Sequence, residues 1–379
     1  MAIDQQTLSP RRAVAEIDLA AITANCRSLR SELVGGAGFC AVVKADGYGH
    51  GMAEVAGAAL AGGAERLAVV TVAEAAQLRE RFPDSSILLL APFEASEADA
   101  AIVTAAELTA CTLDQVAAIT RAAGEAGART AVHVKLDTGM SRFGAKTEQD
   151  AEEVLDAIAA DENLSAAGVW THFATADELD DDFFGAQLAR FAAFAERAKS
   201  RHPGLLAHAA NSAATLRDAA SHFDFVRCGI AIYGLDPFHV DAAARGLKPG
   251  LSLRSYVASV RTLAAGESAG YGRRFAAEAD TTIATVPIGY GDGWRRALSS
   301  KADVLIDGQR FPQRGTVSMD SITVDVGDAA VEIGAPVTLI GHDGSASIST
   351  EEVAERAGTI NYEITCGLTP RTLRDYSPR

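Results

Sequence analysis

Short apolar runs alternate with alanine-rich stretches of helical period over the first two thirds of the chain. After a helix expected near residues 18–33, the runs span residues 39–45, 66–71, 86–91, 108–112, 130–137, 166–173, 205–211 and 225–233. Continuous apolar runs are typical of parallel strands buried on both faces, and each gap between them can hold one helix. Eight such units predict an α/β fold, a (β/α)8 TIM barrel.

A doubly wound open sheet is the alternative fold for this region. Such a sheet usually has fewer strands, and no G-x-G-x-x-G motif follows the first run at residues 39–45. The barrel is therefore the favoured interpretation.

The pattern changes to a period of two from about residue 251 onward. Alternating segments span residues 251–263, 281–288, 303–306, 321–326 and 336–340, and Gly and Asp residues separate them. This is typical of a mostly antiparallel β domain with one helix, expected at residues 350–357. We predict two domains, 1–248 and 249–379. The N-terminal residues of the first domain can pack on the β domain.

Charge and cysteine content exclude several classes of partner. The 34 basic and 50 acidic residues leave a formal charge of -16, which disfavours nucleic acid and anionic membranes. The five cysteines form no CxxC pair, so we interpret them as buried thiols of a reducing cytoplasm and expect no metal site. No apolar run is long enough to predict a membrane span, and no secretion signal is expected.

Lys44 closes the first apolar run, within A-V-V-K-A-D-G-Y-G-H-G. In a TIM barrel the reactive groups lie at the C-terminal ends of the strands. A desolvated lysine there has a lowered pKa, and its neutral amine can form a Schiff base. The alternative is a strand-end lysine whose ammonium group reaches solvent, as most lysines do.

Small and polar residues end the last two runs. Ser212 follows the seventh run, and Gly229 and Ile230 lie within the eighth. In TIM barrels the loops after strands seven and eight commonly bind phosphate through backbone N–H groups and a hydroxyl. Such a site facing Lys44 would suit pyridoxal phosphate (PLP), although Ser212 could equally be a helix N-cap.

Nine motifs occur in order along nearly the whole chain. They are K-A-D-G-Y-G-H-G (44–51), V-K-L-D-T-G-M-S-R-F-G (134–144), T-H-F-A-T-A-D (171–177), H-A-A-N-S-A-A (208–214), V-R-C-G-I-A-I-Y-G (226–234), A-G-Y-G (269–272), I-G-Y-G-D-G (288–293), S-M-D (318–320) and T-I-N-Y-E-I-T-C-G-L (359–368). Each motif is weak alone, but together they resemble the alanine racemase family. The resemblance implies a PLP-dependent, fold-type III enzyme that works as a homodimer.

The resemblance also implies the two catalytic residues. Lys44 matches the lysine that holds PLP as an aldimine and acts as one base. Tyr271 matches the opposite base, which the other subunit contributes, and His172 matches the histidine that hydrogen-bonds that tyrosine. Removing Hα from one face of a planar carbanion and protonating the other face requires such a pair.

Other positions match cofactor-binding and substrate-binding residues of the family. Arg227 matches the arginine that faces the pyridine nitrogen, and His208 matches its partner. The remaining matches are Tyr48, Asn211, Ser212, Gly229, Ile230 and Tyr362 on the phosphate side, Arg142 near the phenolic oxygen and substrate, Met319 at the substrate carboxylate, and Lys135 (a lysine that can be carbamylated), Tyr290 and Asp320 as supporting residues. His50 and His133 have no partner visible in the sequence, so we interpret both as structural.

The predicted function is interconversion of L- and D-alanine, which supplies D-alanine for cell-wall peptidoglycan. Three alternatives stay open at this point: a broad-specificity or serine racemase, a fold-type III amino-acid decarboxylase, and a non-catalytic PLP-binding protein. A decarboxylase normally has a carboxylate where Arg227 stands. A PLP carrier would not need a second domain with Tyr271.

Overall fold

The computed structural model describes residues 12–377, which form two compact units. Among the described residues, the barrel unit comprises 22–47 and 52–232, and the β unit comprises 12–21, 48–51 and 233–377. The division therefore falls at Tyr233, whereas the sequence places the boundary after residue 248. The intervening segment folds back within the β unit, where the Gly250 N–H donates to the Tyr233 carbonyl (2.9 Å).

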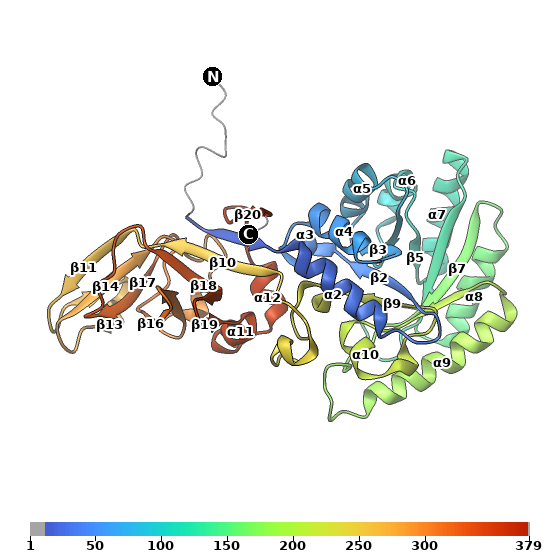
Figure 1. The fold of residues 1–379 in the computed structure, drawn as a ribbon. Helices are drawn as coiled ribbons and strands as arrows, with labels where there is room; N and C mark the ends of the chain where they lie inside the picture. The colour runs from blue at the N-terminus through green and yellow to red at the C-terminus, as the bar shows by residue number, and fades with distance from the viewer. Residues whose placement is uncertain (1–11, 378–379) are drawn as a thin grey trace, which may run out of the picture. The chain divides into compact units, whose positions relative to one another are not determined.

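Eight parallel strands form the barrel unit (Figure 1). One sheet has the order β4 (Ser86–Leu89), β3 (Arg66–Val69), β2 (Gly38–Val42), β9 (Phe225–Cys228), and the other has the order β5 (Leu108–Ala110), β6 (Thr130–Lys135), β7 (Leu164–Trp170), β8 (Leu206–His208). Backbone hydrogen bonds join the sheets at both edges, from Leu89 N–H to Glu107 O and from Arg227 N–H to Ala210 O. The predicted TIM barrel is confirmed, and each predicted run overlaps one strand.

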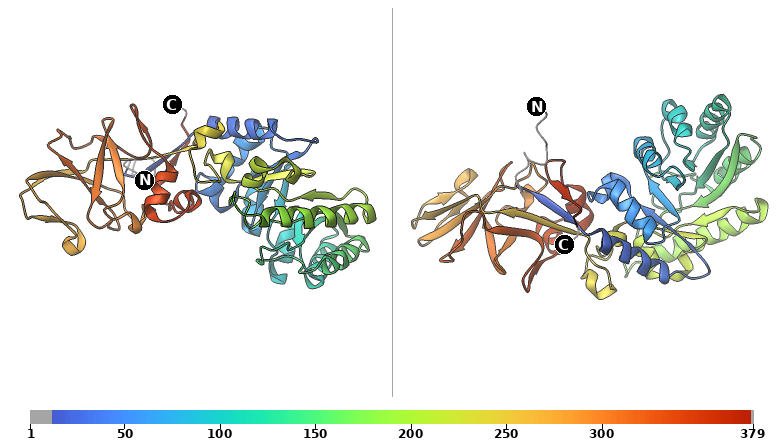
Figure 2. Two further views of the ribbon diagram at one scale, coloured as in Figure 1. Left: turned by 90° about the horizontal axis from the view of Figure 1, so that it is seen from below. Right: turned by 45° about the horizontal axis from the view of Figure 1, so that its top comes forward.

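Helices lie outside the barrel strands (Figures 1 and 2), and all but the first, which precedes β2, connect successive strands. They are α2 (Leu19–Ser31), α4 (Met52–Ala61), α5 (Val72–Arg81), η1 (Ala95–Glu97), α6 (Ala98–Val103), α7 (Leu113–Ala126), α8 (Glu148–Ala159), α9 (Phe183–Arg201), α10 (Ser212–Arg217) and η2 (Ala219–Ser221). Threonine side chains cap α5, α7 and α8, as expected where a short hydroxyl side chain precedes a helix. In α9 the buried residues include Phe184, Phe191 and Phe194, which recur at helical spacing.

The β unit contains a long sheet that is antiparallel at all but one pairing. Its strand order is β11 (Ser259–Leu263), β14 (Thr281–Val286), β17 (Ile322–Gly327), β16 (Gln309–Arg314), β15 (Asp303–Ile306), β18 (Pro336–Asp343), β10 (Leu251–Tyr256), β1 (Val14–Ile17), β20 (Leu373–Asp375), with β19 (Ala346–Ile348) paired to β18 and a small hairpin of β12 (Ser268–Ala269) and β13 (Phe275–Ala276). Only β1 and β20 run parallel. The predicted antiparallel domain is confirmed.

Two helices and short 3-10 segments complete the β unit. The predicted helix is α11 (Thr350–Ala357), and the Ser349 side chain caps it by accepting from the Glu352 N–H. The others are α12 (Asn361–Cys366), η4 (Ala242–Arg245), η5 (Tyr271–Arg273) and η6 (Arg296–Leu298). Within residues 12–377 no helix is long and apolar enough to cross a membrane.

None of the five cysteines forms a disulfide, and four of them are buried. Cys366 is the exception, because it ends α12 with its side chain exposed. The expectation that all five would be buried is therefore wrong at this position.

A comparison of two glycines of the β unit can distinguish the cost of backbone strain from the cost of a steric clash. Gly234 and Gly246 both have left-handed φ angles, +74° and +68°, but a Cβ on Gly234 would lie 1.8 Å from the Lys248 carbonyl oxygen, and one on Gly246 would meet nothing within 4 Å. Gly246→Ala should lower the free energy of unfolding by about 1 kcal/mol, the cost of the left-handed backbone alone. Gly234→Ala should cost about 3 kcal/mol because the clash is added.

The measurement is urea unfolding followed by tryptophan fluorescence. The chain has two tryptophans, so a Trp170→Phe background leaves the buried Trp294 to report on the β unit. Equal losses for the two glycine variants would show that the approach of the Lys248 carbonyl does not constrain residue 234.

Candidate active site

Lys44 stands two residues after the end of β2, at the start of a strained turn. Its side chain is half-buried, and the next two residues, Ala45 and Asp46, have left-handed backbone angles (φ 53° for both). The Ala45 N–H donates to Glu74 Oε1 (2.7 Å), and Asp46 Oδ1 accepts from the Met52 N–H (3.0 Å) at the start of α4. Left-handed non-glycine residues cost free energy and concentrate at functional sites, so the turn marks Lys44 as a candidate.

Arg227 lies on β9 beside β2 and is almost fully buried, with 3% of its surface exposed. Nη2 donates to the carbonyl oxygens of Thr171 and Ala209 (2.9 Å each), and Nη1 lies 2.8 Å from His208 Nδ1. Nη2 also lies 3.4 Å from His172 Nδ1. Burial lowers the pKa of Arg227 to about 10, so the guanidinium still carries its charge at neutral pH.

The two neighbouring histidines are held neutral. Burial, and then the positive charge of Arg227, lower the pKa values of His172 and His208 well below the usual range. The charges of Arg142, Lys44 and Lys135 also lower the pKa of His172. The barrel therefore gathers these cationic groups around one uncharged histidine.

Ser212 lies at the N-terminal end of α10, but it is not the cap of this helix. Asn211 is the N-cap, because its side-chain Oδ1 accepts from the Ala214 N–H (2.9 Å). The Ser212 hydroxyl instead accepts from the N–H groups of Gly229 (2.9 Å) and Ala231 (3.3 Å). The N-cap interpretation of Ser212 is wrong, and Ser212 lies against the loop that contains Gly229 and Ile230.

Lys135 ends β6 with no exposed surface. Its Nζ donates to the Phe143 carbonyl and lies 4.5 Å from the centre of the Phe143 ring. Burial lowers the pKa of Lys135 to about 8, which leaves part of the amine neutral near physiological pH. Arg142 is exposed, and its guanidinium carbon lies 5.2 Å from the Phe143 ring.

The other predicted site residues belong to the β unit. Tyr48 stacks on Tyr233 with ring centres 4.9 Å apart, and the Tyr362 ring lies 6.1 Å from Tyr48. Tyr271, in η5, is 72% exposed, and Tyr290 and Met319 are 41% and 51% exposed. Within this unit Tyr48 and Tyr362 therefore lie close together, whereas Tyr271 extends into solvent.

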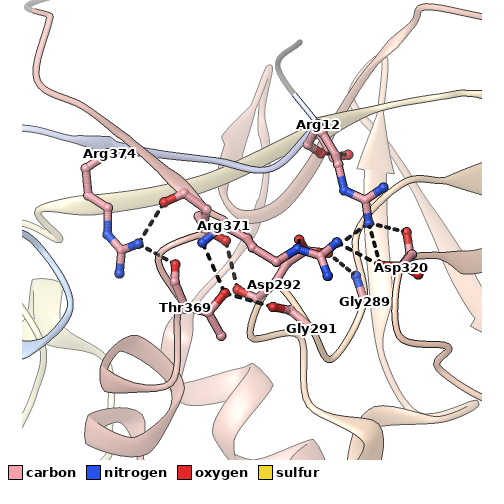
Figure 3. Close-up of polar contacts among 10 residues, drawn as sticks. Arg12, Gly289, Gly291, Asp292, Asp320, Thr369, Arg371 and Arg374 are labelled. Carbon is pink, nitrogen blue, oxygen red and sulfur yellow. Dashed lines mark hydrogen bonds and ion pairs between the residues drawn. The ribbon is translucent and has the colours of Figure 1, made fainter. Parts of the chain in front are cut away.

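A buried carboxylate orders the loop that carries Tyr290 (Figure 3). The Asp292 side chain has no exposed surface and lies 3.2 Å from Arg12 Nη2 and 3.1 Å from Arg371 Nε. Asp292 also accepts from the Gly289 N–H (2.9 Å). The neighbouring N–H groups of Tyr290 and Gly291 donate to the carbonyls of Ser318 and Met319, which places Tyr290 beside Met319.

Asp320 lies at the exposed edge of the same cluster. Its Oδ1 is 2.7 Å from Arg371 Nη2, and 57% of its side chain is exposed. Asp292 and Asp320 thus share Arg371 but differ in burial.

Comparison with known proteins decides the family. Residues 17–237 match the model of the alanine racemase N-terminal domain, and residues 250–376 match that of the C-terminal domain. The chain belongs to the alanine racemase family. It is 40% identical over 363 residues to the alanine racemase of Geobacillus kaustophilus, covering 95% of this chain and 93% of that protein.

Solved structures of family members have the same fold. An alanine racemase from Streptomyces coelicolor matches with a TM-score of 0.91 and 38% identity, over 97% of this chain and 98% of that chain. One from Bartonella henselae, with covalently bound pyridoxal phosphate, matches with a TM-score of 0.86 and 30% identity, over 97% and 100%. The chain is thus a PLP-dependent isomerase that interconverts L- and D-alanine. The decarboxylase and non-catalytic alternatives are set aside.

The residues of the barrel unit fit a PLP cofactor. The buried cation of Arg227, the half-buried amine of Lys44 and the Ser212 hydroxyl at the Gly229 amide all belong to the C-terminal ends of strands in one barrel. These groups match the three parts of PLP. An amine binds its aldehyde, a cation faces its aromatic nitrogen, and an amide-hydroxyl cluster binds its phosphate.

His133, which the sequence analysis interprets as structural, and Glu107, which it does not name, also belong to this region. His133 Nε2 lies 2.8 Å from Glu107 Oε2, and His133 Nδ1 lies 3.1 Å from His208 Nε2. One signal was present in the sequence: His133 and Lys135 stand two residues apart in one strand and so share a face. Glu107 gave no such signal, because it lies just before β5.

Asp292 and Asp320 offer a matched test of the cluster in Figure 3. Asp292→Ala should lower the free energy of unfolding by about 3 kcal/mol, because it leaves two arginines without their buried partner. Asp320→Ala should cost less than about 1 kcal/mol, as exposed ion pairs do. Urea unfolding monitored by Trp294 fluorescence measures both, and a loss at Asp320 as large as that at Asp292 would refute the distinction.

Proposed function

We propose that this enzyme racemises alanine with two proton-transfer groups, Lys44 on one face of the substrate and Tyr271 on the other. Inversion at Cα requires a base on one side and an acid on the other. When bound, PLP supplies the electron sink that stabilises negative charge at Cα. The chain itself must hold the cofactor, place the two bases and limit other reactions.

Lys44 is proposed to bind the cofactor aldehyde and to act as the first base. Support comes from its place at the end of β2, next to β9 and its Arg227. Its half-buried amine lies at the start of a turn that Glu74 and Asp46 hold. This anchoring keeps Nζ in one region of the barrel, which proximity catalysis requires.

The buried guanidinium of Arg227 is the observation that carries the proposal. Its hydrogen bonds to His208, Thr171 and Ala209 use one Nη1 hydrogen and both Nη2 hydrogens, so Nε–H is one of the donors left for a pyridine nitrogen. A guanidinium that stays protonated cannot give its proton to this nitrogen. The electron sink is therefore weaker than beside a carboxylate, which favours racemisation over transamination and decarboxylation.

His172 is proposed to favour the phenolate form of Tyr271. The positive guanidinium lies 3.4 Å from His172 Nδ1 and favours a lone pair there, so we assign the proton of the neutral ring to Nε2. A tyrosine has an ordinary pKa near 10. A hydrogen bond from Nε2–H to the phenolate oxygen would lower that pKa, as hydrogen bonds to a charged form do.

The remaining cofactor contacts are assigned by position. We assign phosphate binding to Ser212, Gly229, Ile230, Tyr48 and Tyr362, with Asn211 holding the N-terminus of α10. Arg142 and Met319 are assigned to the phenolic oxygen and the substrate carboxylate, and Tyr290 and Asp320 to the active-site entrance. The lowered pKa of Lys135 supports its carbamylation, because only the neutral amine adds CO2.

A homodimer is proposed because three assigned residues are exposed side chains of the β unit. Tyr271, Tyr290 and Met319 present aromatic and apolar surface to solvent. Neighbouring exposed apolar side chains, such as Tyr290 and Met319, are typical of interaction surfaces. In a two-fold dimer, each Tyr271 would enter the barrel of the other subunit.

The enzyme is proposed to act in the cytoplasm and to supply D-alanine for peptidoglycan. Support for a reducing compartment comes from the five cysteines, none of which forms a disulfide.

Borohydride labelling tests the role of Lys44. Reduction of the protein with bound PLP should fix the cofactor mass on the peptide that contains Lys44. Lys44→Ala should bind PLP without a covalent bond and convert no L-alanine to D-alanine by chiral chromatography. Lys199→Ala, which removes a surface lysine paired with Asp224, serves as the control with full activity. A label on any other lysine would contradict the assignment.

Mixed dimers test Tyr271 and the dimer together. Lys44→Ala and Tyr271→Ala homodimers should both be nearly inactive. A mixed dimer has one site with both lesions and one with neither, so random mixing should restore roughly a quarter of wild-type activity. Differently tagged subunits verify the exchange.

Two outcomes would contradict the assignment of Tyr271 as the second base. Verified mixed dimers without activity would place Tyr271 in its own chain's site or outside catalysis. Tyr271→Ala should also still exchange Hα of D-alanine with D2O through Lys44 but not Hα of L-alanine. Equal loss for both enantiomers would refute one base on each face.

A further inference from the structure

Four side chains of the barrel unit form one line of hydrogen bonds that ends at a carboxylate. Arg227 Nη1 lies 2.8 Å from His208 Nδ1, and His208 Nε2 lies 3.1 Å from His133 Nδ1. His133 Nε2 lies 2.8 Å from Glu107 Oε2. The four residues come from β9, β8, β6 and the segment just before β5, so the line crosses the barrel interior.

The residues of the barrel interior bury these side chains and leave room for the two imidazole rings. His133 and His208 have no exposed surface, and Arg227 is only 3% exposed. A Cβ on Gly168 of β7 would lie 2.5 Å from His133 Nδ1, so a glycine is required there for the imidazole to fit. Trp170 stacks on His208 with ring centres 5.6 Å apart.

The partners determine where the protons lie. Arg227 is a donor only, so His208 must present a lone pair at Nδ1 and carry its proton on Nε2. That Nε2–H donates to His133, which must accept at Nδ1 and carry its own proton on Nε2. His133 then donates to Glu107, which must be an acceptor. Arg227 at one end and Glu107 at the other therefore favour the same tautomer for each histidine.

The charges along the line agree with this arrangement. Burial alone raises the pKa of Glu107, but hydrogen bonds from His133 and Ser86 and the charge of Arg66 outweigh it and lower the pKa to about 2. His208 has a pKa well below its usual range. The line therefore has an anion at one end, a cation at the other and neutral rings between them.

We propose that Glu107 is a positioning residue for racemisation, which acts through His133 and His208 to hold Arg227 in its charged, hydrogen-bonded orientation. The proposal rests on the proposed role of Arg227 at the cofactor nitrogen. With Glu107 removed, His133 is free to take the other tautomer, and then His208 can present an N–H toward Arg227. Two facing donors repel, so the guanidinium would shift or lose a hydrogen bond in a buried place.

A purely structural role for Glu107 is the competing explanation. Its backbone N–H and C=O already pair with Ile87 and Leu89 where β4 meets β5, and its Oε1 accepts from Ser86. These contacts would stabilise the barrel whether or not Oε2 orders the histidines. The experiment must therefore measure the proton positions on the histidines directly, in addition to the rate of racemisation.

Nitrogen NMR of the holoenzyme labelled with 15N-histidine gives the first readout. In the wild type, His133 and His208 should each show a bare Nδ1 and a protonated Nε2, with signals assigned from His133→Asn and His208→Asn. In Glu107→Leu, His133 should no longer show this single tautomer. In Ser86→Ala, which removes the hydrogen bond to the other carboxylate oxygen, both histidines should keep it.

Steady-state kinetics give the second readout. Glu107→Leu should lower kcat for alanine racemisation about tenfold, the effect of losing one hydrogen bond to a charged group, while KM changes less than about twofold. Ser86→Ala should keep wild-type kcat. Glu107→Gln keeps the side-chain shape and one acceptor oxygen, so it should fall between the wild type and Glu107→Leu in both readouts. It also replaces Glu107→Leu if that variant does not fold by circular dichroism.

Three results would overturn the proposal. Unchanged histidine tautomers in Glu107→Leu and Glu107→Gln would show that the carboxylate does not order the line. Changed tautomers with unchanged kcat would show that the order does not matter to the reaction. An equal loss of kcat in Ser86→Ala would point to the structural role. A wild-type enzyme that formed no D-alanine would refute the proposed function instead, while the tautomers would still test the proton arrangement.

Discussion

The buried charge of Arg227 is the constraint on which the barrel interior depends. A guanidinium removed from water must have its N–H groups accepted by nearby oxygens or nitrogens, since an unpaired buried charge is very costly. Here the carbonyls of Thr171 and Ala209 supply two acceptors, and His208 Nδ1 supplies a third. Because a protonated imidazole has no lone pair, His208 must stay neutral, and its neutrality sets the tautomer of the next residue inward. Residues that seem unrelated in the sequence are thus selected by one cation.

Closure of the barrel explains why Lys44 and Arg227 belong to one site. The first strand, β2, pairs in parallel with the last, β9, with Cys40 opposite Arg227 and Ala41 opposite Cys228. Parallel strands end at the same edge, so Lys44, after β2, and the loop with Gly229, after β9, emerge side by side. In an open sheet these two strands could stand at opposite edges. The sequence-based prediction that Lys44 and the Gly229 loop share one site therefore depended on the prediction of a closed barrel.

Periodicity predicted the strands and helices, which depend on single segments of the chain. It missed the contacts between residues that are far apart in the sequence. The eight runs, the antiparallel domain and the helix at Thr350–Ala357 follow from patterns within a few residues of one another. The Asp292 cluster could not be predicted, because Arg12 lies 280 residues away in sequence. The turn after Lys44 was also hidden, since Ala45 and Asp46 are not the glycines that left-handed angles favour. Ser212 was ambiguous because Asn211, one residue earlier, is an equally good N-cap.

Asp292 and Arg227 are buried charged residues that are balanced in different ways, and the difference separates stability from function. Asp292 in the β unit has two arginines within about 3 Å, so its charge is cancelled locally and serves to hold a loop. Arg227 in the barrel instead pairs with the carbonyl dipoles of Thr171 and Ala209 and with a neutral His208 ring. The nearest anion along the hydrogen-bond line is Glu107, three hydrogen bonds away. Dipoles orient a cation without neutralising it, so Arg227 keeps a positive field for a ligand atom. An adjacent carboxylate would have stabilised Arg227 more and left less of its charge for chemistry.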